Sequence, residues 1–174
     1  CGVTCNHSIK WRNVRTLIKE LSCDEYERLL NHYTHVETLV QRNRKSNKII
    51  ERLRNVPLYD RRDEECISPH TDGWEQRYYS ILFRIYPDNK RISEISRNYV
   101  EGLEWTFMYY TSGCIDWRWS YKYNYPPLLN DLINHIPYFS GDILERKEKN
   151  PIHPLAQLSY VLPSTSSTLL PDNI

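Results

Sequence analysis

Aromatic residues in an alternating pattern are the side chains of this sequence best suited to contact a ligand. Five of them occupy every second position along one segment: Trp117, Trp119, Tyr121, Tyr123 and Tyr125. In an extended segment, residues two apart leave the backbone on the same side, so all five rings would share one face. Exposed rings can stack on nucleic-acid bases, whereas buried rings would brace the segment against a neighbouring region of the protein. For the three tyrosines we predict the bracing role.

A basic run is the second feature that could contact nucleic acid. Its cations are Arg42, Arg44, Lys45, Lys48, Arg52 and Arg54. Cations on a helix can neutralise phosphates, although such a run is more often only a solvated face. The first four are our candidate phosphate contacts, with the solvated face as the open alternative. The whole chain has 23 Lys and Arg against 22 Asp and Glu, which argues against a general coat for polyanions.

The sequence shows no pattern for catalysis by this chain alone. Hydrolysis or phosphoryl transfer needs converging carboxylates that hold a metal, or a nucleophile beside a base. The acidic residues are scattered singly or lie at expected helix starts, and His32 and His35 form a pair without a third ligand. The five glycines are not clustered, so no phosphate-binding loop is indicated. We predict no catalytic residue, no metal site and no cofactor bound by this chain.

The cysteines indicate a reducing compartment, cytoplasmic or nuclear. They number five, an odd count, and form no Cys-x-x-Cys pair. A zinc site of Cys1, Cys5, His7 and Cys23 is the alternative, but the spacings match no familiar ligand pattern. No stretch suits a membrane helix, since the longest charge-free one contains four prolines. The chain begins with Cys1 and has one Met, at position 108, so we expect a piece of a larger protein.

Helices should position these residues, because apolar residues recur at three- and four-residue intervals along most of the chain. The predicted helices are 9–21, 23–53, 73–85, 92–112, 128–136 and 155–161. Two capping boxes should begin the second and third helices: Ser22 with Glu25, and Asp72 with Glu75. Gly113 should end the fourth helix, and the charged segment 60–71 should be a loop. The predicted fold class is mainly α.

Residues 99–127, YVEGLEWTFMYYTSGCIDWRWSYKYNYPP, resemble a signature of the Xrn-type 5′→3′ exoribonucleases. The segments GWEQRYYSILF (73–83) and PLAQLSYVLPSTSSTLLP (154–171) are also similar to that family. The resemblance is specific over 70–171, whereas over 9–55 only the helical pattern agrees. The sequence departs from the family pattern at Asp116, Ser120, Lys122, Asn124 and Pro126. These departures suggest a divergent member, of viral or protist origin.

The resemblance implies that the chain is the helical middle region of such an enzyme. It predicts a multi-helix accessory domain with an extended aromatic segment and an irregular C-terminal tail. Residues 1–69 would form an N-terminal helical region with the basic helix and charged loop. Residues 70–174 would form the family-like region with the Trp/Tyr segment and the Pro/Ser tail. The catalytic N-terminal domain, with its Mg²⁺, would lie outside this chain, so the chain alone should be inactive.

The same resemblance implies a role at the substrate. The region would pack on the catalytic domain, in the same or another chain, and complete an active-site wall that admits single-stranded 5′-monophosphate RNA. Trp117 and Trp119 match the family's tryptophan near the RNA path. We predict that one anchors the segment while the other lines the path, and we favour Trp119 as the anchor. The alternative is a non-catalytic helical module that binds a protein partner or RNA; no membrane partner is expected.

Overall fold

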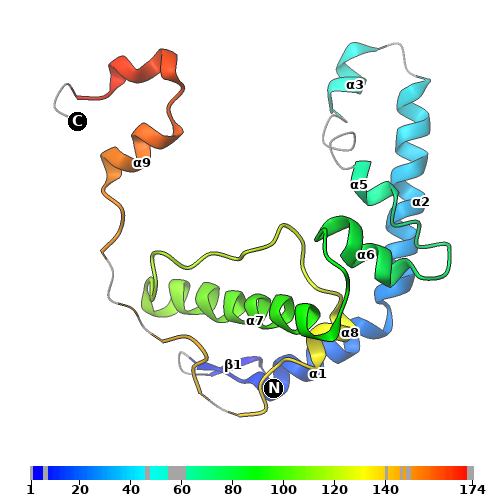
Figure 1. Cartoon of the computed structure of the whole chain (residues 1–174), viewed down its shortest axis with the longest axis horizontal. Helices are drawn as coiled ribbons and strands as arrows, with labels where there is room; N and C mark the ends of the chain where they lie inside the picture. The colour runs from blue at the N-terminus through cyan, green and yellow to red at the C-terminus, as the bar shows by residue number, and fades with distance from the viewer. Residues whose placement is uncertain are drawn as a thin grey trace.

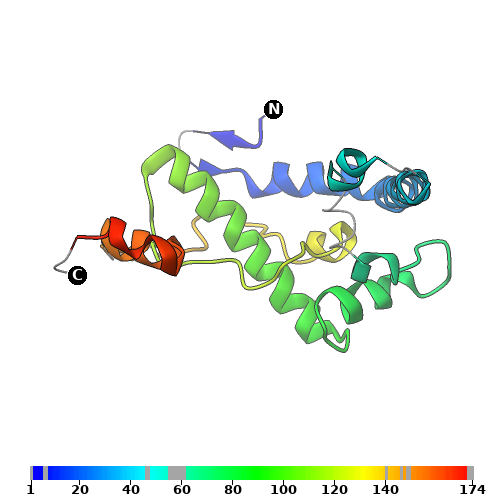
Figure 2. The same cartoon turned by 90° about the horizontal axis from the view of Figure 1, so that it is seen from above.

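Helices make up most of the chain in the computed structural model, as the sequence predicts (Figures 1 and 2). The structure describes residues 2–5, 8–45, 48–54, 62–139, 141–145, 147 and 150–171. The helices are α1 (Trp11–Cys23), α2 (Glu25–Arg44), α3 (Ile49–Arg54), α5 (Arg62–Glu65), α6 (Trp74–Leu82), α7 (Asn89–Ser112), α8 (Leu129–Ile133), α9 (Pro154–Val161) and the 3₁₀ helix η1 (Ser164–Leu169). A short antiparallel pair precedes them, β1 (Thr4–Cys5) and β2 (Ser8–Ile9), with Thr4 opposite Ile9.

The helices form a base from which two arms rise (Figure 1). Helices α1, α7 and α8 lie in the base, where α8 packs against both of the others. Helices α2 and α3 form one arm, and α9 with η1 forms the other. The segment between α7 and α8 runs back along α7, so the aromatic residues of 117–125 belong to the base (Figures 1 and 2).

Two apolar cores hold the base together, and α7 contributes to both. The first is made of Ile67, Tyr78, Tyr79, Ile95 and Leu128, and the second of Trp11, Val100, Leu132 and Ile136. Both cores therefore combine residues from either side of the predicted boundary between residues 69 and 70. The division of the chain at that boundary stays a prediction. Because α7 packs into both cores, it gives the aromatic segment fixed support.

The arm containing α2 differs from the single long helix predicted over 23–53. Helix α2 ends at Arg44, a turn follows at Lys45, and α3 begins at Ile49. No glycine or proline marks this break in the sequence. Ser46 and Asn47, which lie outside the described residues, are weak helix formers because their side chains compete for backbone hydrogen bonds. The short strands β1 and β2 are a second feature that the sequence pattern does not predict.

The first predicted capping box is wrong. Ser22 lies in the last turn of α1, where its hydroxyl donates to the Lys19 carbonyl oxygen at 2.8 Å. Glu25 Oε1 accepts a hydrogen bond from the Leu129 N–H at 2.7 Å, 104 residues away in sequence. The carboxylate thus caps α8 and not its own helix, a partnership that local spacing cannot reveal. Partial burial raises the pKa of Glu25 above its usual value.

The second predicted capping box is also wrong, because Gly73 is the N-cap of α6 and no side chain caps it. Gly73 has φ +77°, which glycine adopts without the strain that a Cβ would cause. The preceding loop is held by Arg77 of α6. Its guanidinium donates to the carbonyl oxygens of Ile67 at 2.8 Å and Asp72 at 2.7 Å. The segment predicted as a loop over 60–71 includes the short helix α5 among its described residues.

Candidate nucleic-acid interface

The aromatic segment keeps the predicted alternation from residue 119 onward. The rings of Trp119, Tyr121, Tyr123 and Tyr125 are half-buried, and the residues between them, Ser120, Lys122 and Asn124, are exposed. Trp117 departs from this pattern, because it lies in a turn and 45% of its surface is exposed. The five rings therefore do not share one face. Four pack inward on the helices, and the fifth faces solvent.

The tyrosines of this segment pack as the sequence predicts. Tyr121 contacts Tyr99 of α7 edge-on, with ring centroids 5.6 Å apart, and its hydroxyl donates to the Tyr125 carbonyl oxygen at 2.6 Å. Burial raises the pKa of the Tyr121 hydroxyl above its usual value. Tyr123 lies against Phe83 at 5.7 Å between ring centroids and packs on the first core. The three tyrosines brace the segment through both ring packing and hydrogen bonds.

Replacing Tyr123 by Ala should destabilise the fold, because its ring packs on the first core and has a structural role. The ring is half-buried, so we expect a loss of about 2–3 kcal/mol in the free energy of unfolding, at the low end for aromatic truncation. Urea unfolding of the complete protein measures this. Tyr123→Phe is the control, since it keeps the ring and should be nearly neutral. Equal stability of the parent and Tyr123→Ala would show that the ring does not brace the segment.

A stack of three rings connects the segment to α7. Trp105 lies between Tyr109, at 5.2 Å and 14° between ring planes, and Trp119, at 5.7 Å and 21°. The Trp105 indole N–H donates to the Asp116 carbonyl oxygen at 2.8 Å, which fixes its ring. The period-2 pattern does not reveal this role, because Trp105 lies outside the alternating segment. Its four-residue spacing from Tyr109, which places both rings on one helix face, is the signal that could have found it.

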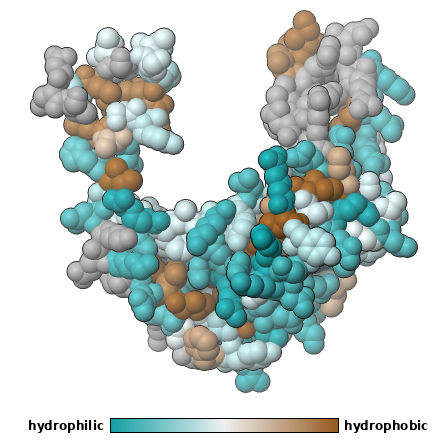
Figure 3. Space-filling view, viewed as in Figure 1, coloured by the Kyte–Doolittle hydropathy of each residue, from teal (hydrophilic) through white to brown (hydrophobic). Residues whose placement is uncertain are grey.

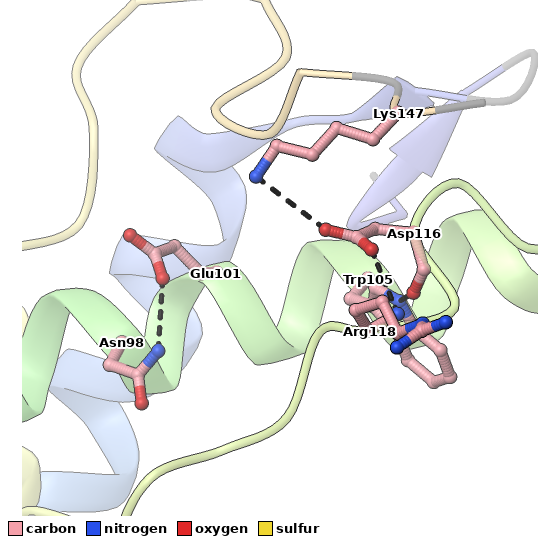
Figure 4. A network of polar contacts seen from close by, with 6 residues as sticks. All are labelled: Asn98, Glu101, Trp105, Asp116, Arg118 and Lys147. Atoms are coloured by element: carbon pink, nitrogen blue, oxygen red, sulfur yellow. Dashed lines mark hydrogen bonds and ion pairs between the residues drawn. The ribbon is translucent and has the colours of Figure 1, made fainter. Parts of the chain in front are cut away.

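The turn that carries Trp117 is held by a polar network around Asp116 (Figure 4). Asp116 is only 6% exposed; its Oδ1 accepts from the Arg118 N–H at 2.8 Å, and its Oδ2 lies 3.6 Å from Lys147 Nζ. The Lys147 N–H donates to the Ile115 carbonyl oxygen at 2.9 Å. The carboxylate of Asp116 thus adds an ion pair with Lys147 to the turn. The exposed ring of Trp117 is thus mounted on a fixed backbone.

Two buried polar side chains of α7 hold the flanking segments. The Asn98 side-chain oxygen accepts from the Lys122 N–H at 3.0 Å. The Glu104 carboxylate accepts from the Ile143 N–H at 2.8 Å and from the Leu144 N–H at 2.6 Å. Glu104 is 3% exposed, and this burial raises its pKa. The segment that Glu104 holds leads to Lys147, which pairs with Asp116. Glu104 thereby supports one side of the turn around Trp117, and Asn98 supports the segment that follows the turn.

The basic run lies on the arm formed by α2 and α3. Arg42, Lys45 and Lys48 are exposed there, and the side chain of Arg44 lies outside the described residues, as do those of Arg52 and Arg54. The C-terminal end of α7 and the turn that follows it lie on the other side of the molecule (Figures 1 and 2). The structure does not bring the two predicted RNA-contacting features together. Their contact with RNA stays a prediction for each separately.

No metal centre is formed by the residues that the structure describes. Among them, no three or more His, Cys, Asp or Glu residues are grouped so as to hold an ion. The alternative zinc site includes Cys1 and His7, which lie outside the described residues. The described cysteines, Cys5, Cys23, Cys66 and Cys114, are free thiols. Among the described helices, none is long and apolar enough to cross a bilayer.

The structure is a helical domain whose base carries a braced aromatic segment and an exposed tryptophan. Residues 7–174 match the family model described as the Xrn1 helical domain, which covers nearly the whole chain. The chain belongs to this family, as the resemblance in its sequence predicts.

Named relatives agree with this assignment. The chain is 32% identical over 138 residues to the 5'-3' exoribonuclease 2 homolog of Drosophila melanogaster, covering 78% of the chain and 14% of that relative. It is 37% identical over 109 residues to 5'-3' exoribonuclease 2 of Gallus gallus, covering 62% and 11%. It is 30% identical over 129 residues to 5'-3' exoribonuclease 1 of Schizosaccharomyces pombe, covering 71% and 9%. The chain thus spans about a tenth of the length of these relatives.

Proposed function

We propose that this chain is the helical region of a 5′→3′ exoribonuclease, where it packs on the catalytic domain and completes the active-site wall for single-stranded 5′-monophosphate RNA. The observation that carries the proposal is the exposed Trp117 on a turn fixed by buried polar contacts. An indole that is 45% exposed contributes less to the stability of its own domain than a buried one, and its exposed part can offer a face to a base. The relatives' names supply the reaction class.

The two tryptophans have different roles in this proposal. Trp119 is the anchor, because its ring stacks on Trp105 and lies against α7 at Gly102. Trp117 lines the RNA path and stacks on a base that passes the wall. Arg118 and Lys122, whose side chains are exposed on the same segment, add positive charge that attracts the RNA backbone. A ring that lines a narrow path also leaves no room for a double helix.

Packing on the catalytic domain is supported by apolar residues on the two arms. Ile49, Ile50 and Leu53 of α3 are each more than half exposed. On the other arm, Leu158, Tyr160 and Val161 of α9 are exposed. Figure 3 shows apolar side chains gathered at these two places. Such patches on separated arms are typical of surfaces that a further domain covers. The proposed division into residues 1–69 and 70–174 would then place one of these two patches on each region.

Catalysis belongs to residues outside this chain in our proposal. The described residues do not fit a Mg²⁺ site, since no group of carboxylates converges among them. The metal would therefore be held by the catalytic domain. The basic run on the arm formed by α2 and α3 would contact RNA phosphates outside the active site. The free thiols fit the reducing cytoplasmic or nuclear compartment predicted from the cysteine count.

The isolated 174-residue chain should have no nuclease activity, since its described residues lack a carboxylate cluster. Incubation with 5′-monophosphorylated RNA and Mg²⁺, followed by analysis of the released nucleotides, measures this. The complete protein is the positive control and should release mononucleotides processively. Processive degradation by the purified chain alone would contradict the proposal. Inactivity of the complete protein would favour the alternative, a non-catalytic helical module that binds a protein partner or RNA.

A further inference from the structure

Helix α7 has a glycine in its interior, where glycine is unfavourable. Gly102 lies between helical residues on both sides, far from the ends of α7 at Asn89 and Ser112. A helix-interior glycine destabilises a helix relative to alanine, because it loses more conformational freedom on folding. Its backbone is helical, so no positive φ explains it. The reason must come from the side chains that lie against this position.

The space beside Gly102 is filled by the Trp119 ring. A Cβ added at residue 102 would lie 2.8 Å from Trp119 Cη2, with Cζ2 at 3.5 Å and Cζ3 at 3.7 Å. A separation of 2.8 Å between two carbons is well inside their contact distance of about 3.5–4.0 Å. The ring cannot simply swing away, because its other neighbour is Trp105, stacked at 5.7 Å and fixed by its own indole hydrogen bond.

Trp119 and Trp117 lie two residues apart at one turn, so a backbone shift that relieves a clash at Trp119 would also move Trp117. The Trp119 N–H donates to the Asp116 carbonyl oxygen at 3.4 Å, the same oxygen that accepts from the Trp105 indole. Asn98, four residues before Gly102 on the same helix face, holds the next residues of the segment through Lys122. The contact of Trp119 with α7 is therefore one of the contacts that hold this turn in place.

We propose that Gly102 is a positioning residue: the absence of its side chain sets the depth of Trp119 and thereby the place at which Trp117 meets RNA. The effect on where Trp117 meets RNA rests on the proposed function, whereas the effect on the depth of Trp119 does not. Alanine at 102 would favour the helix but displace Trp119 outward, together with the turn that carries Trp117. A misplacement of about 1 Å far from the reacting atoms can cost roughly a hundredfold in rate.

The test is a double-mutant cycle in the complete enzyme with Gly102→Ala and Trp119→Phe. Phenylalanine is shorter and has no atom at the Cη2 position, so it leaves room for the new methyl group. Gly102→Ala should lower the thermal midpoint of the parent, but should raise it or leave it unchanged in the Trp119→Phe background. Thr106→Ala, an exposed position one turn further along α7, is the control and should behave alike in both backgrounds. Equal losses from Gly102→Ala in both backgrounds would overturn the inference.

The second readout separates positioning from packing. Gly102→Ala should reduce the preference for single-stranded over 5′-structured RNA by roughly tenfold, within the range for a misplaced side chain. A changed midpoint with an unchanged preference would overturn the positioning role. If Trp117→Ala alters that preference while Gly102→Ala does not, the inference fails and the proposed function stands. If neither substitution alters the preference, both the inference and the proposed function fail, whatever the double-mutant cycle shows for packing.

Discussion

In the complete protein, replacing Trp117 by Ala should leave the fold intact and weaken the handling of RNA. The ring is 45% exposed and the turn beneath it is held by Asp116 and Lys147, so its loss removes less packing than the loss of Trp119. A base stacked on an aromatic side chain gains ~1–3 kcal/mol, which corresponds to a loss of roughly 5- to 150-fold in degradation rate. The measurement is the rate of release of mononucleotides from single-stranded and from 5′-structured RNA. The variant should degrade single-stranded RNA more slowly or admit 5′-structured RNA more readily.

Two further variants complete this experiment. Trp119→Ala removes a ring stacked on Trp105 and leaves a void beside Gly102, so it should lower the free energy of unfolding by about 2–4 kcal/mol. Tyr86→Ala removes a ring that is 84% exposed before the first turn of α7, and should change neither stability nor activity. If Trp117→Ala and Trp119→Ala both treat the two RNA substrates as the parent does, the wall role is wrong and both rings are structural only.

Replacing Glu104 by Ala should cause the largest loss of stability among polar substitutions of α7. The buried carboxylate accepts from the N–H groups of Ile143 and Leu144, and no other acceptor is described for either. Leaving these donors unpaired should cost about 3 kcal/mol, since hydrogen bonds to a charged group contribute roughly 1.5–3 kcal/mol each and water restores some of the loss. Urea unfolding measures this loss, with Glu94→Ala on the exposed face of α7 as the neutral control.

The pH dependence of stability gives a second test at Glu104. Burial raises its pKa in the folded state, so in the range above the ordinary value of 4.5 the folded chain binds more protons here than the unfolded chain. Its contribution is therefore fully present below that value and is lost as the pH rises through the raised pKa. Glu104→Gln removes this titration. The stability of the parent relative to Glu104→Gln should fall with rising pH in that window, and a constant difference would contradict the assignment.

The sequence predicts the helix ends well where residues at the end itself determine them. Gly113 ends α7 with φ +86°, and α9 begins with Pro154 and ends at Val161, close to the predicted 155–161. The predicted start of α7 is three residues late, because the pattern around Asp88 indicates only a turn. In the structure the Asp88 side chain caps the helix and accepts from the Arg91 N–H at 2.7 Å. Local patterns thus predict the helices and lose a few residues at their ends.

Polar partners distant in sequence account for two of the features that the sequence could not predict. Glu25 has the spacing of a local cap, yet its carboxylate accepts from Leu129 across the fold. Glu104 looks like one more charged residue of a helix, yet it is buried against Leu144. The alternation of the aromatic segment correctly predicts inward rings from 119 onward. Trp117 breaks the alternation because Asp116 makes a turn there, which the period-2 pattern does not contain.

Photochemical cross-linking tests the central claim most directly. The complete protein would be irradiated with single-stranded 5′-monophosphorylated RNA that carries a photoreactive base, and the modified peptide would be mapped by mass spectrometry. Our account predicts a cross-link to Trp117 that disappears in Trp117→Ala and persists in Tyr86→Ala. Efficient cross-linking to other regions of the enzyme, with none in the turn from Ile115 to Trp119, would contradict it.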